Sequence, residues 1–160
     1  MAYQKLQVGL ASVVIKSDTI PIPVESSSQI SGTATATTVN KLEDSSAPFT
    51  SAELKTGAIV VNNTDSTIAE VTNVDSSSVL SLSQDIMASG ESYTIYLTPQ
   101  LNKSQGCILY IPTDGDIKVE TVSGSEVTYA GVKGGTFLPV QVYKVFSTGT
   151  TVTGDIIANW

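Results

Sequence analysis

"IKSDTIPIPVESSSQISG", residues Ile15 to Gly32, decides how the chain is organised. The stretch begins as the end of a β-branched strand, passes through Pro21 and Pro23, and continues as a serine-rich segment. Proline lacks the N–H group that a sheet ladder needs, so strand pairing is expected to stop here. Because no hairpin partner follows directly, the strand requires a partner elsewhere in the chain.

The counterpart is "LNKSQGCILYIP", residues 101–112, where a strand begins with no strand directly before it. Joining the two stretches predicts a discontinuous β domain of residues 1–24 plus 104–160, with residues 25–103 inserted as a second β module. Folds tolerate such insertions where the two ends of a loop lie close together. Ile15–Pro23 should then lie near Cys107–Pro112 in one domain. The alternative is a single larger sandwich built from the whole chain.

Composition predicts an all-β protein, because valine, isoleucine and threonine favour the pleated surface of a strand over a helix. One segment, Ser46–Gly57, has the polar start and glycine end of a helical turn. The expected fold class is a small antiparallel β-sandwich or barrel formed by both termini, with a second small β module inserted. Alternation and turn residues predict strands at 5–15, 33–41, 58–63, 67–74, 79–83, 92–97, 107–112, 117–122, 127–132, 136–146 and 155–160.

Two local signals refine this prediction. Thr113-Asp114-Gly115-Asp116 predicts a tight hairpin, because Asp-Gly tolerates the positive φ that matches strand twist. Pro139 stands inside the longest predicted strand and predicts an edge or a bulge there.

The charge pattern argues against several classes of partner. The net charge is -7, all eight cationic residues are lysines spread singly along the chain, and histidine is absent. Nucleic acids and anionic lipids both attract clustered basic residues, so we expect neither as a partner. No stretch approaches the roughly 20 apolar residues that span a bilayer. The first residues alternate like a strand, so we expect no signal peptide.

The groups that could carry chemistry all have simpler interpretations. Asp114 and Asp116 lack the ligand run of a calcium loop and are explained by the turn. Glu120 and Glu126 could approach across a hairpin, as glycosidase carboxylates do, but a solvated sheet face is favoured. Cys107 fits a buried strand residue, and the serines have no histidine to activate them. We therefore expect no enzyme, no metal and no cofactor.

From Gly106 onward, the sequence resembles the small β domain of virion proteins of tailed phages and gene-transfer agents, described as head spike base or head decoration proteins. The N-terminal "VIKSDTIPIP" is similar to the segment that precedes the Gly-Cys strand in that family. The middle block looks like a meander module of structural proteins from marine phages. The matching positions are Gly106, Cys107, Leu109 to Ile111, Val127 to Tyr129, Leu138 to Val140, Ser147 to Thr151 and Ile156 to Trp160.

This resemblance implies a non-enzymatic structural protein of a bacteriophage virion, made in the host cytoplasm and placed on the capsid surface. It implies a symmetric homo-oligomer, with a trimer favoured, that contacts the major capsid protein or other virion proteins. The discontinuous domain would serve virion attachment and oligomerisation. The family motifs carry no catalytic signature, so no functional residue is transferred. As interface residues we select Ala2, Tyr3 and Trp160, because terminal segments and strand edges are ready contact sites.

Two alternative functions remain open. The inserted module could bind a carbohydrate or another host-surface molecule, and this alternative predicts a tyrosine-bearing face around Tyr93 and Tyr96. The protein could instead be a tail or baseplate adaptor, which only its position in the particle distinguishes from a capsid decoration protein.

Overall fold

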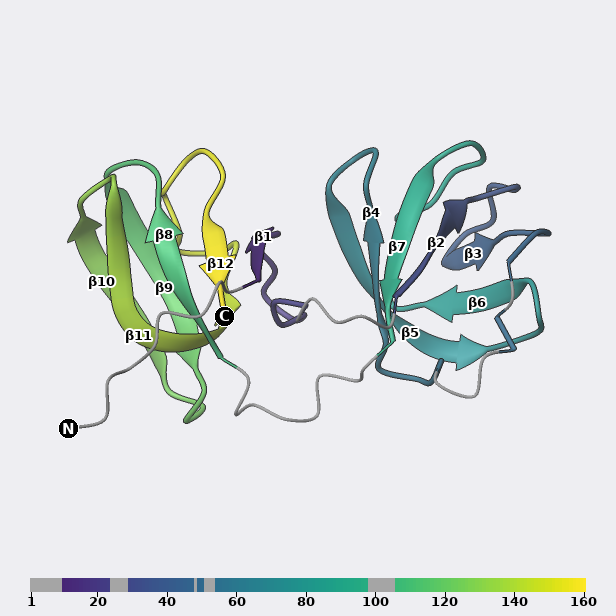
Figure 1. Cartoon of the computed structure of the whole chain (residues 1–160), viewed down its shortest axis with the longest axis horizontal. Helices are drawn as coiled ribbons and strands as arrows, with labels where there is room; N and C mark the ends of the chain where they lie inside the picture. The colour runs from purple at the N-terminus through teal and green to yellow at the C-terminus, as the bar shows by residue number, and fades with distance from the viewer. Residues whose placement is uncertain (1–9, 24–28, 48, 51–53, 98–105) are drawn as a thin grey trace. The chain divides into compact units, whose positions relative to one another are not determined.

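The computed structural model describes residues 10–23, 29–47, 49–50, 54–97 and 106–160. They form an all-β protein with two six-stranded antiparallel sheets, as the composition predicts (Figure 1). The chain divides into two compact units, one of residues 1–25 and 103–160 and the other of residues 26–102. The exact domain boundaries expected from sequence, at 24/25 and 103/104, lie outside the described residues. We call the two units the terminal unit and the inserted unit.

The terminal unit contains one sheet in the order β1-β12-β8-β11-β9-β10, which curves into a half-barrel (Figure 1). Its concave side encloses a core to which Leu109, Ile117 and Val142 contribute. Both ends of the chain therefore build the same sheet. The strands are β1 (Ala11–Val13), β8 (Cys107–Ile111), β9 (Gly115–Thr121), β10 (Glu126–Val132), β11 (Thr136–Val145) and β12 (Ile157–Asn159).

The stretch Ile15–Pro23 belongs to this unit. Val14, directly before the stretch, and Ile22, near its end, are buried in the same core as Cys107. The predicted proximity is therefore confirmed. Its backbone does not pair with Cys107–Pro112. The amide of Val14 donates to Ile156 (2.8 Å), and that of Ile22 donates to Tyr143 (3.0 Å). The segment therefore lies along β12 and β11 rather than beside β8. Of the strand predicted at 5–15, the described part forms only β1.

β11 explains both a correct and a wrong prediction. The register of its pairing with β8 shifts between Leu138 and Val142, so the bulge predicted at Pro139 is confirmed. The bent strand lies between β8 and β9, pairing with β8 through its first half and with β9 through its second. Thr113–Asp116 therefore does not close a hairpin, because the two strands that it joins are not neighbours in the sheet. The Asp-Gly sequence indicates a turn from neighbouring residues alone, whereas β11 determines which strands pair with β8 and β9.

The inserted unit contains the second sheet, in the order β2-β7-β4-β5-β6-β3. Its strands match most of the meander predicted from sequence. They are β2 (Gln29–Thr33), β3 (Lys41–Glu43), β4 (Ile59–Asn62), β5 (Thr67–Val74), β6 (Val79–Leu82) and β7 (Ser92–Tyr96).

The strand predicted at 33–41 is wrong. Residues between β2 and β3 form a reversal in which the amide of Thr35 donates to Glu43 (2.7 Å) and that of Lys41 donates to Thr38 (3.0 Å). Asn40 takes a φ of 55°, which asparagine tolerates better than most residues. The helical turn predicted at Ser46–Gly57 lies partly outside the described residues, and its described part forms turns and irregular backbone. Among the residues that the structure describes, no helix has the length and apolar character to cross a bilayer.

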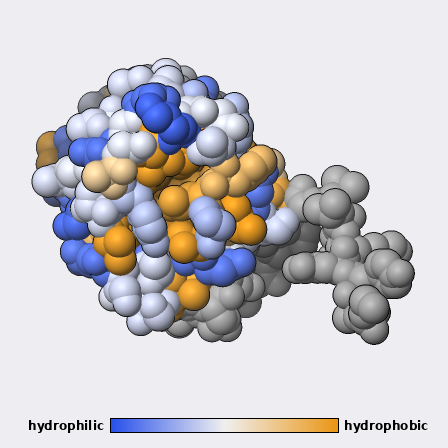
Figure 2. All heavy atoms as spheres, turned by 90° about the vertical axis from the view of Figure 1, so that its left-hand side faces the viewer, coloured by the Kyte–Doolittle hydropathy of each residue, from blue (hydrophilic) through white to orange (hydrophobic). Residues whose placement is uncertain are grey.

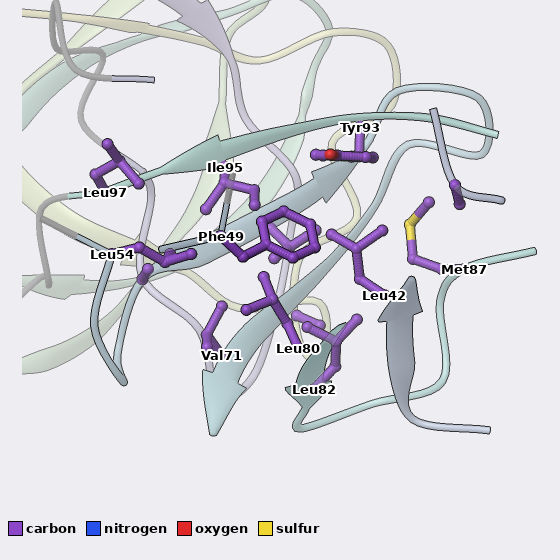
Figure 3. Close-up of a cluster of buried hydrophobic side chains, with 14 residues drawn as sticks. Leu42, Phe49, Leu54, Val71, Leu80, Leu82, Met87, Tyr93, Ile95 and Leu97 are labelled. Carbon is purple, nitrogen blue, oxygen red and sulfur yellow. The ribbon is translucent and has the colours of Figure 1, made fainter. Parts of the chain in front are cut away.

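The core of the inserted unit is formed by side chains from several strands and loops, which point toward one another in Figure 3. Phe49 packs against Tyr93 with ring centroids 6.3 Å apart. The Tyr93 hydroxyl donates to Asp44 (2.8 Å), and both residues are buried. Gly32 is required here, because a Cβ atom at its position would lie 2.5 Å from the Tyr93 hydroxyl oxygen.

Candidate interaction surface

The convex face of the terminal unit carries a row of apolar side chains that crosses four strands. Pairing places Val13 opposite Ile157, Ile157 opposite Tyr110, and Tyr110 opposite Phe137. Directly opposed residues of antiparallel strands project to the same face of a sheet. On β8, Tyr110 alternates with the buried Leu109 and Ile111, so the row lies opposite the core. We call these four residues, with Ile108 beside them, the outer stripe.

The outer stripe is accessible. Phe137 is 62% exposed, Val13 51% and Ile108 39%, while Tyr110 and Ile157 are half-buried. The Tyr110 and Phe137 rings meet edge to face, with centroids 5.5 Å apart. The pair therefore presents a broad aromatic surface to the surroundings. Scattered exposed apolar residues are ordinary, whereas a contiguous row of this kind is a candidate contact surface.

Sequence reasoning did not select the outer stripe. In "CILYI" every residue of β8 is apolar or aromatic, so the alternation that separates a buried face from a solvated one is missing. The missing alternation could have revealed the outer stripe. A strand that is apolar on both faces packs against a core on each side or exposes one apolar face to a partner.

The three interface residues selected from the sequence have different outcomes. Ala2 and Tyr3 lie outside the described residues. Trp160 is half-buried and packs against the core of the terminal unit, while its backbone amide donates to Leu10 (3.0 Å). Part of the Trp160 side chain therefore stabilises the fold rather than standing free for a partner.

Glu120 and Glu126 are directly opposite each other on β9 and β10, as the hairpin pattern suggested. Each carboxylate has its own cation: Lys144 lies 3.1 Å from Glu120, and Lys118 lies 3.1 Å from Glu126. Both ammonium groups also lie over the Phe146 ring, at 4.4 and 4.3 Å from its centroid. The arrangement is a network of ion pairs and cation–π contacts. The Glu126 side chain is 55% exposed, as expected for a solvated face, whereas the Glu120 and Lys144 side chains are only 12% exposed each, so that expectation fails for Glu120.

Asp114 and Asp116 are engaged in loop structure. Asp114 accepts from Lys133 Nζ (2.6 Å) and from the Gly134 amide (2.8 Å), and Asp116 accepts from the Gly131 amide (2.7 Å). The hydrogen bond from Lys133, with that from Gly134, lowers the pKa of Asp114 below its usual value. Asp114 therefore ties the β8–β9 connection to the β10–β11 connection, and Asp116, on β9, binds the backbone of β10 at Gly131. Within the described ranges, no group of three potential metal ligands is brought together.

Cys107 is buried in the terminal core, and its thiol donates to the Val142 carbonyl at 3.5 Å. Burial raises the pKa of this thiol to about 12, so the nucleophilic thiolate form is strongly disfavoured at neutral pH. The interpretation of Cys107 as a packing residue agrees with this environment.

The tyrosine-bearing face predicted for a carbohydrate site does not include Tyr93. This side chain is 1% exposed and its hydroxyl is bound to Asp44, so it belongs to the core. Tyr96 is half-buried. Glycan binding commonly uses exposed aromatic rings, and the inserted unit does not offer the expected pair.

A buried amide organises the turn between β4 and β5. Asn62 donates to the Ile86 carbonyl (2.6 Å) and to Glu91 (2.8 Å), and its oxygen accepts from the Thr64 amide (2.8 Å). The nearby Glu91 carboxylate raises the pKa of Asp65 by electrostatic repulsion. These polar groups fix loops of the inserted unit and leave the outer stripe as the clearest candidate for a functional surface.

No protein-family model matches this sequence, and neither a curated protein nor a solved structure matches the chain.

Proposed function

We propose that this chain is a non-enzymatic structural protein of a bacteriophage virion, of the capsid decoration or head spike base type, which assembles as a symmetric homo-oligomer on the particle surface. The observation that carries the proposal is the outer stripe. A protein whose most distinctive surface is an exposed apolar row across four strands is suited to lasting protein contact, because covering such a row removes apolar area from water.

The sequence resemblance and the outer stripe coincide in the terminal unit. The motifs similar to head spike base and decoration proteins begin at Gly106, and they include Leu109 to Ile111 and Leu138 to Val140. β8 and β11, which carry those motifs, also carry Tyr110 and Phe137. We therefore assign attachment to the virion to the terminal unit, with the major capsid protein or another virion protein as the partner of the outer stripe.

The chemistry of the surface supports this assignment. The charged side chains around Phe146 form their own ion pairs, and the outer stripe itself contains no ionisable carboxylate or ammonium group. Recognition at the stripe would rest on shape and apolar area, with little dependence on salt.

The test compares two variants that each remove one exposed apolar side chain. Phe137→Ser alters the outer stripe, whereas Val39→Ser alters an apolar residue of the inserted unit that is 71% exposed. Each is added to purified particles of the phage that encodes the protein after removal of the native copies. We expect the occupancy of Phe137→Ser to fall at least about tenfold, which corresponds to about 1.4 kcal/mol, and that of Val39→Ser to stay at the wild-type level.

Cryo-EM of the same particles gives the location. Density on the capsid supports the proposal, whereas density at the tail would replace it by the adaptor function. Mass spectrometry that does not detect the protein in purified particles would contradict a virion role altogether.

A further inference from the structure

β10 is an edge strand, and one of its sides is paired with no strand of the described residues. Within the sheet it pairs only with β9, and no backbone hydrogen bond from another described segment reaches it. At seven residues it is the longest of the four edge strands, since β1 and β3 have three residues each and β2 has five. An unpaired edge of this length is a template for another strand.

The ladder to β9 shows which backbone groups of β10 face outward. The Thr121 amide donates to the Ser125 carbonyl (3.0 Å), which begins the ladder after the turn. Hydrogen-bonded pairs alternate along an antiparallel ladder, so Val127 and Tyr129 are the next residues of β10 that bond to β9. The N–H and C=O groups of Glu126 and Thr128 consequently point away from β9. The next residues, Ala130 and Gly131, lie in the bulge between Tyr129 and Val132, which limits the free ladder.

The side chains leave this edge without the usual protection. Natural edge strands are commonly guarded by proline or by lysine, and "EVTYAGV" contains neither. β3 differs, because Lys41 stands at its start. Between Glu126 and the bulge, β10 therefore has no proline or lysine in the way of an approaching strand.

The charges near the edge are balanced. Glu126 pairs with Lys118 (3.1 Å), and Lys133, just after β10, pairs with Asp114 (2.6 Å). A chain with a net charge of -7 repels its own copies in general, but both ends of this edge are locally neutral. Self-association is thus less opposed by charge here than at an acidic surface.

Half-buried side chains beside the edge add apolar surface. Tyr129 and Val132 of β10 pack against the terminal core without being fully covered. Figure 2 views the side of the molecule where β10 and β11 lie, and it shows hydrophobic residues gathered near the centre of that face with hydrophilic residues around them. A strand added to β10 would cover part of this surface.

We propose that two copies of this chain pair through β10, antiparallel and about a two-fold axis at Thr128. Thr128 lies between Glu126 and the bulge, so this register pairs the two Thr128 residues with each other and places Glu126 opposite Ala130 of the second copy. The two half-barrels then share one continuous sheet. This inference specifies the self-association in the proposed function, but it can be tested on the purified protein alone.

The first experiment removes one outward donor. Thr128→Pro deletes an N–H that faces away from β9, and an edge strand tolerates proline at such a position. Thr128→Val keeps the N–H and serves as the matched control. Strand pairing alone buries little area, so sedimentation velocity is measured over a concentration series that extends well above micromolar. We expect wild type and Thr128→Val to reach twice the 16.7 kDa of one chain, and Thr128→Pro to dimerise at least tenfold more weakly.

The second experiment remains informative if Thr128→Pro fails to fold. Thr128→Cys places two thiols across the axis with Cα atoms about 5.5 Å apart, within the range of a disulfide. Cys107 is 1% exposed and does not compete. We expect mild oxidation to give a covalent dimer with Thr128→Cys, and no covalent dimer with the stripe variant Ile108→Cys.

The outcomes separate this inference from the proposed function. A wild-type protein that stays monomeric at all concentrations, a Thr128→Pro variant that dimerises as wild type does, or a trimer would each overturn the pairing of β10. A trimer would still agree with the homo-oligomer of the proposed function. Loss of particle binding by Phe137→Ser with β10 pairing intact would support both proposals independently.

Discussion

Tyr93 shows how a tyrosine of the core can be mistaken for a binding residue when only the sequence is read. In "SYTIYL" an aromatic residue stands on each face of the strand, and alternation alone does not say which face is buried. The structure buries Tyr93 with Ile95, and the Tyr93 hydroxyl finds Asp44 as its acceptor. Burial, followed by the hydrogen bond to Asp44, raises the pKa of Tyr93, so the phenol stays protonated and donates.

Removing that hydroxyl tests its contribution to stability. Tyr93→Phe leaves the buried Asp44 carboxylate without this donor, and we expect the free energy of unfolding to fall by about 1–3 kcal/mol. Denaturant unfolding followed by circular dichroism measures the change. Tyr110→Phe removes a half-buried phenol hydroxyl in the other unit, which forms no hydrogen bond within the described part of the chain. Equal losses for the two variants would show that the Asp44 contact has no special role.

At the scale of elements, the sequence predicts strands better than it predicts their neighbours. β5 agrees with the predicted range of residues 67–74, and Pro139 correctly marks the bulge of β11. Thr113–Asp116 was assigned to a hairpin because its turn chemistry is local, whereas β11 enters between the flanking strands from more than twenty residues away. The outer stripe was not predicted for the same reason, since only the pairing of β1, β12, β8 and β11 brings its residues into one row.

The segment after β1 gives a prediction at this scale, because Asp18 attaches it to the turn after β11. The Asp18 carboxylate accepts from the hydroxyl of Thr148 (2.6 Å) and from its amide (2.9 Å), and these bonds lower the pKa of Asp18. The folded state therefore binds this proton less tightly than the unfolded state does. The resulting stabilisation is present above the ordinary pKa of 3.8 and is lost as the pH falls through the lowered value.

We accordingly expect Asp18→Ala to be less stable than wild type at pH 7, with the two unfolding midpoints converging as the pH drops below about 4. Hydrogen exchange at the Ser17 and Ile22 amides, which bond to β11, should accelerate in the variant at pH 7. Asp155→Ala removes an exposed carboxylate of the same unit and is the control. A stability difference that persists unchanged at low pH would contradict the role given to the ionised Asp18.

At the scale of the whole molecule, the serine-rich stretch after Pro23 correctly indicated a change of unit. The signal was physical: a segment that runs into two prolines without a hairpin partner must find its backbone partners elsewhere. β1 pairs with β12, and the Ser17 and Ile22 amides donate to β11, so the partners come from the other end of the chain. The sequence did not reveal which of the later strands would accept it, because several apolar strands follow Gly106. Each unit has its own sheet and its own hydrophobic core.

This organisation predicts that residues 26–102 fold on their own. Their sheet is complete without any strand from the terminal unit, and their core includes fully buried side chains such as Leu42, Leu80 and Ile95. We expect the isolated fragment to unfold cooperatively, and Tyr93→Phe to destabilise the fragment by the same amount as the full chain. The reciprocal protein, with residues 26–102 replaced by a Gly/Ser linker of about ten residues, should keep the dispersed NMR spectrum of the terminal unit. If the fragment did not unfold cooperatively while the full chain was stable, the inserted unit would depend on the terminal unit. The fragment keeps every residue of its own core, so missing core contacts could not explain such a difference.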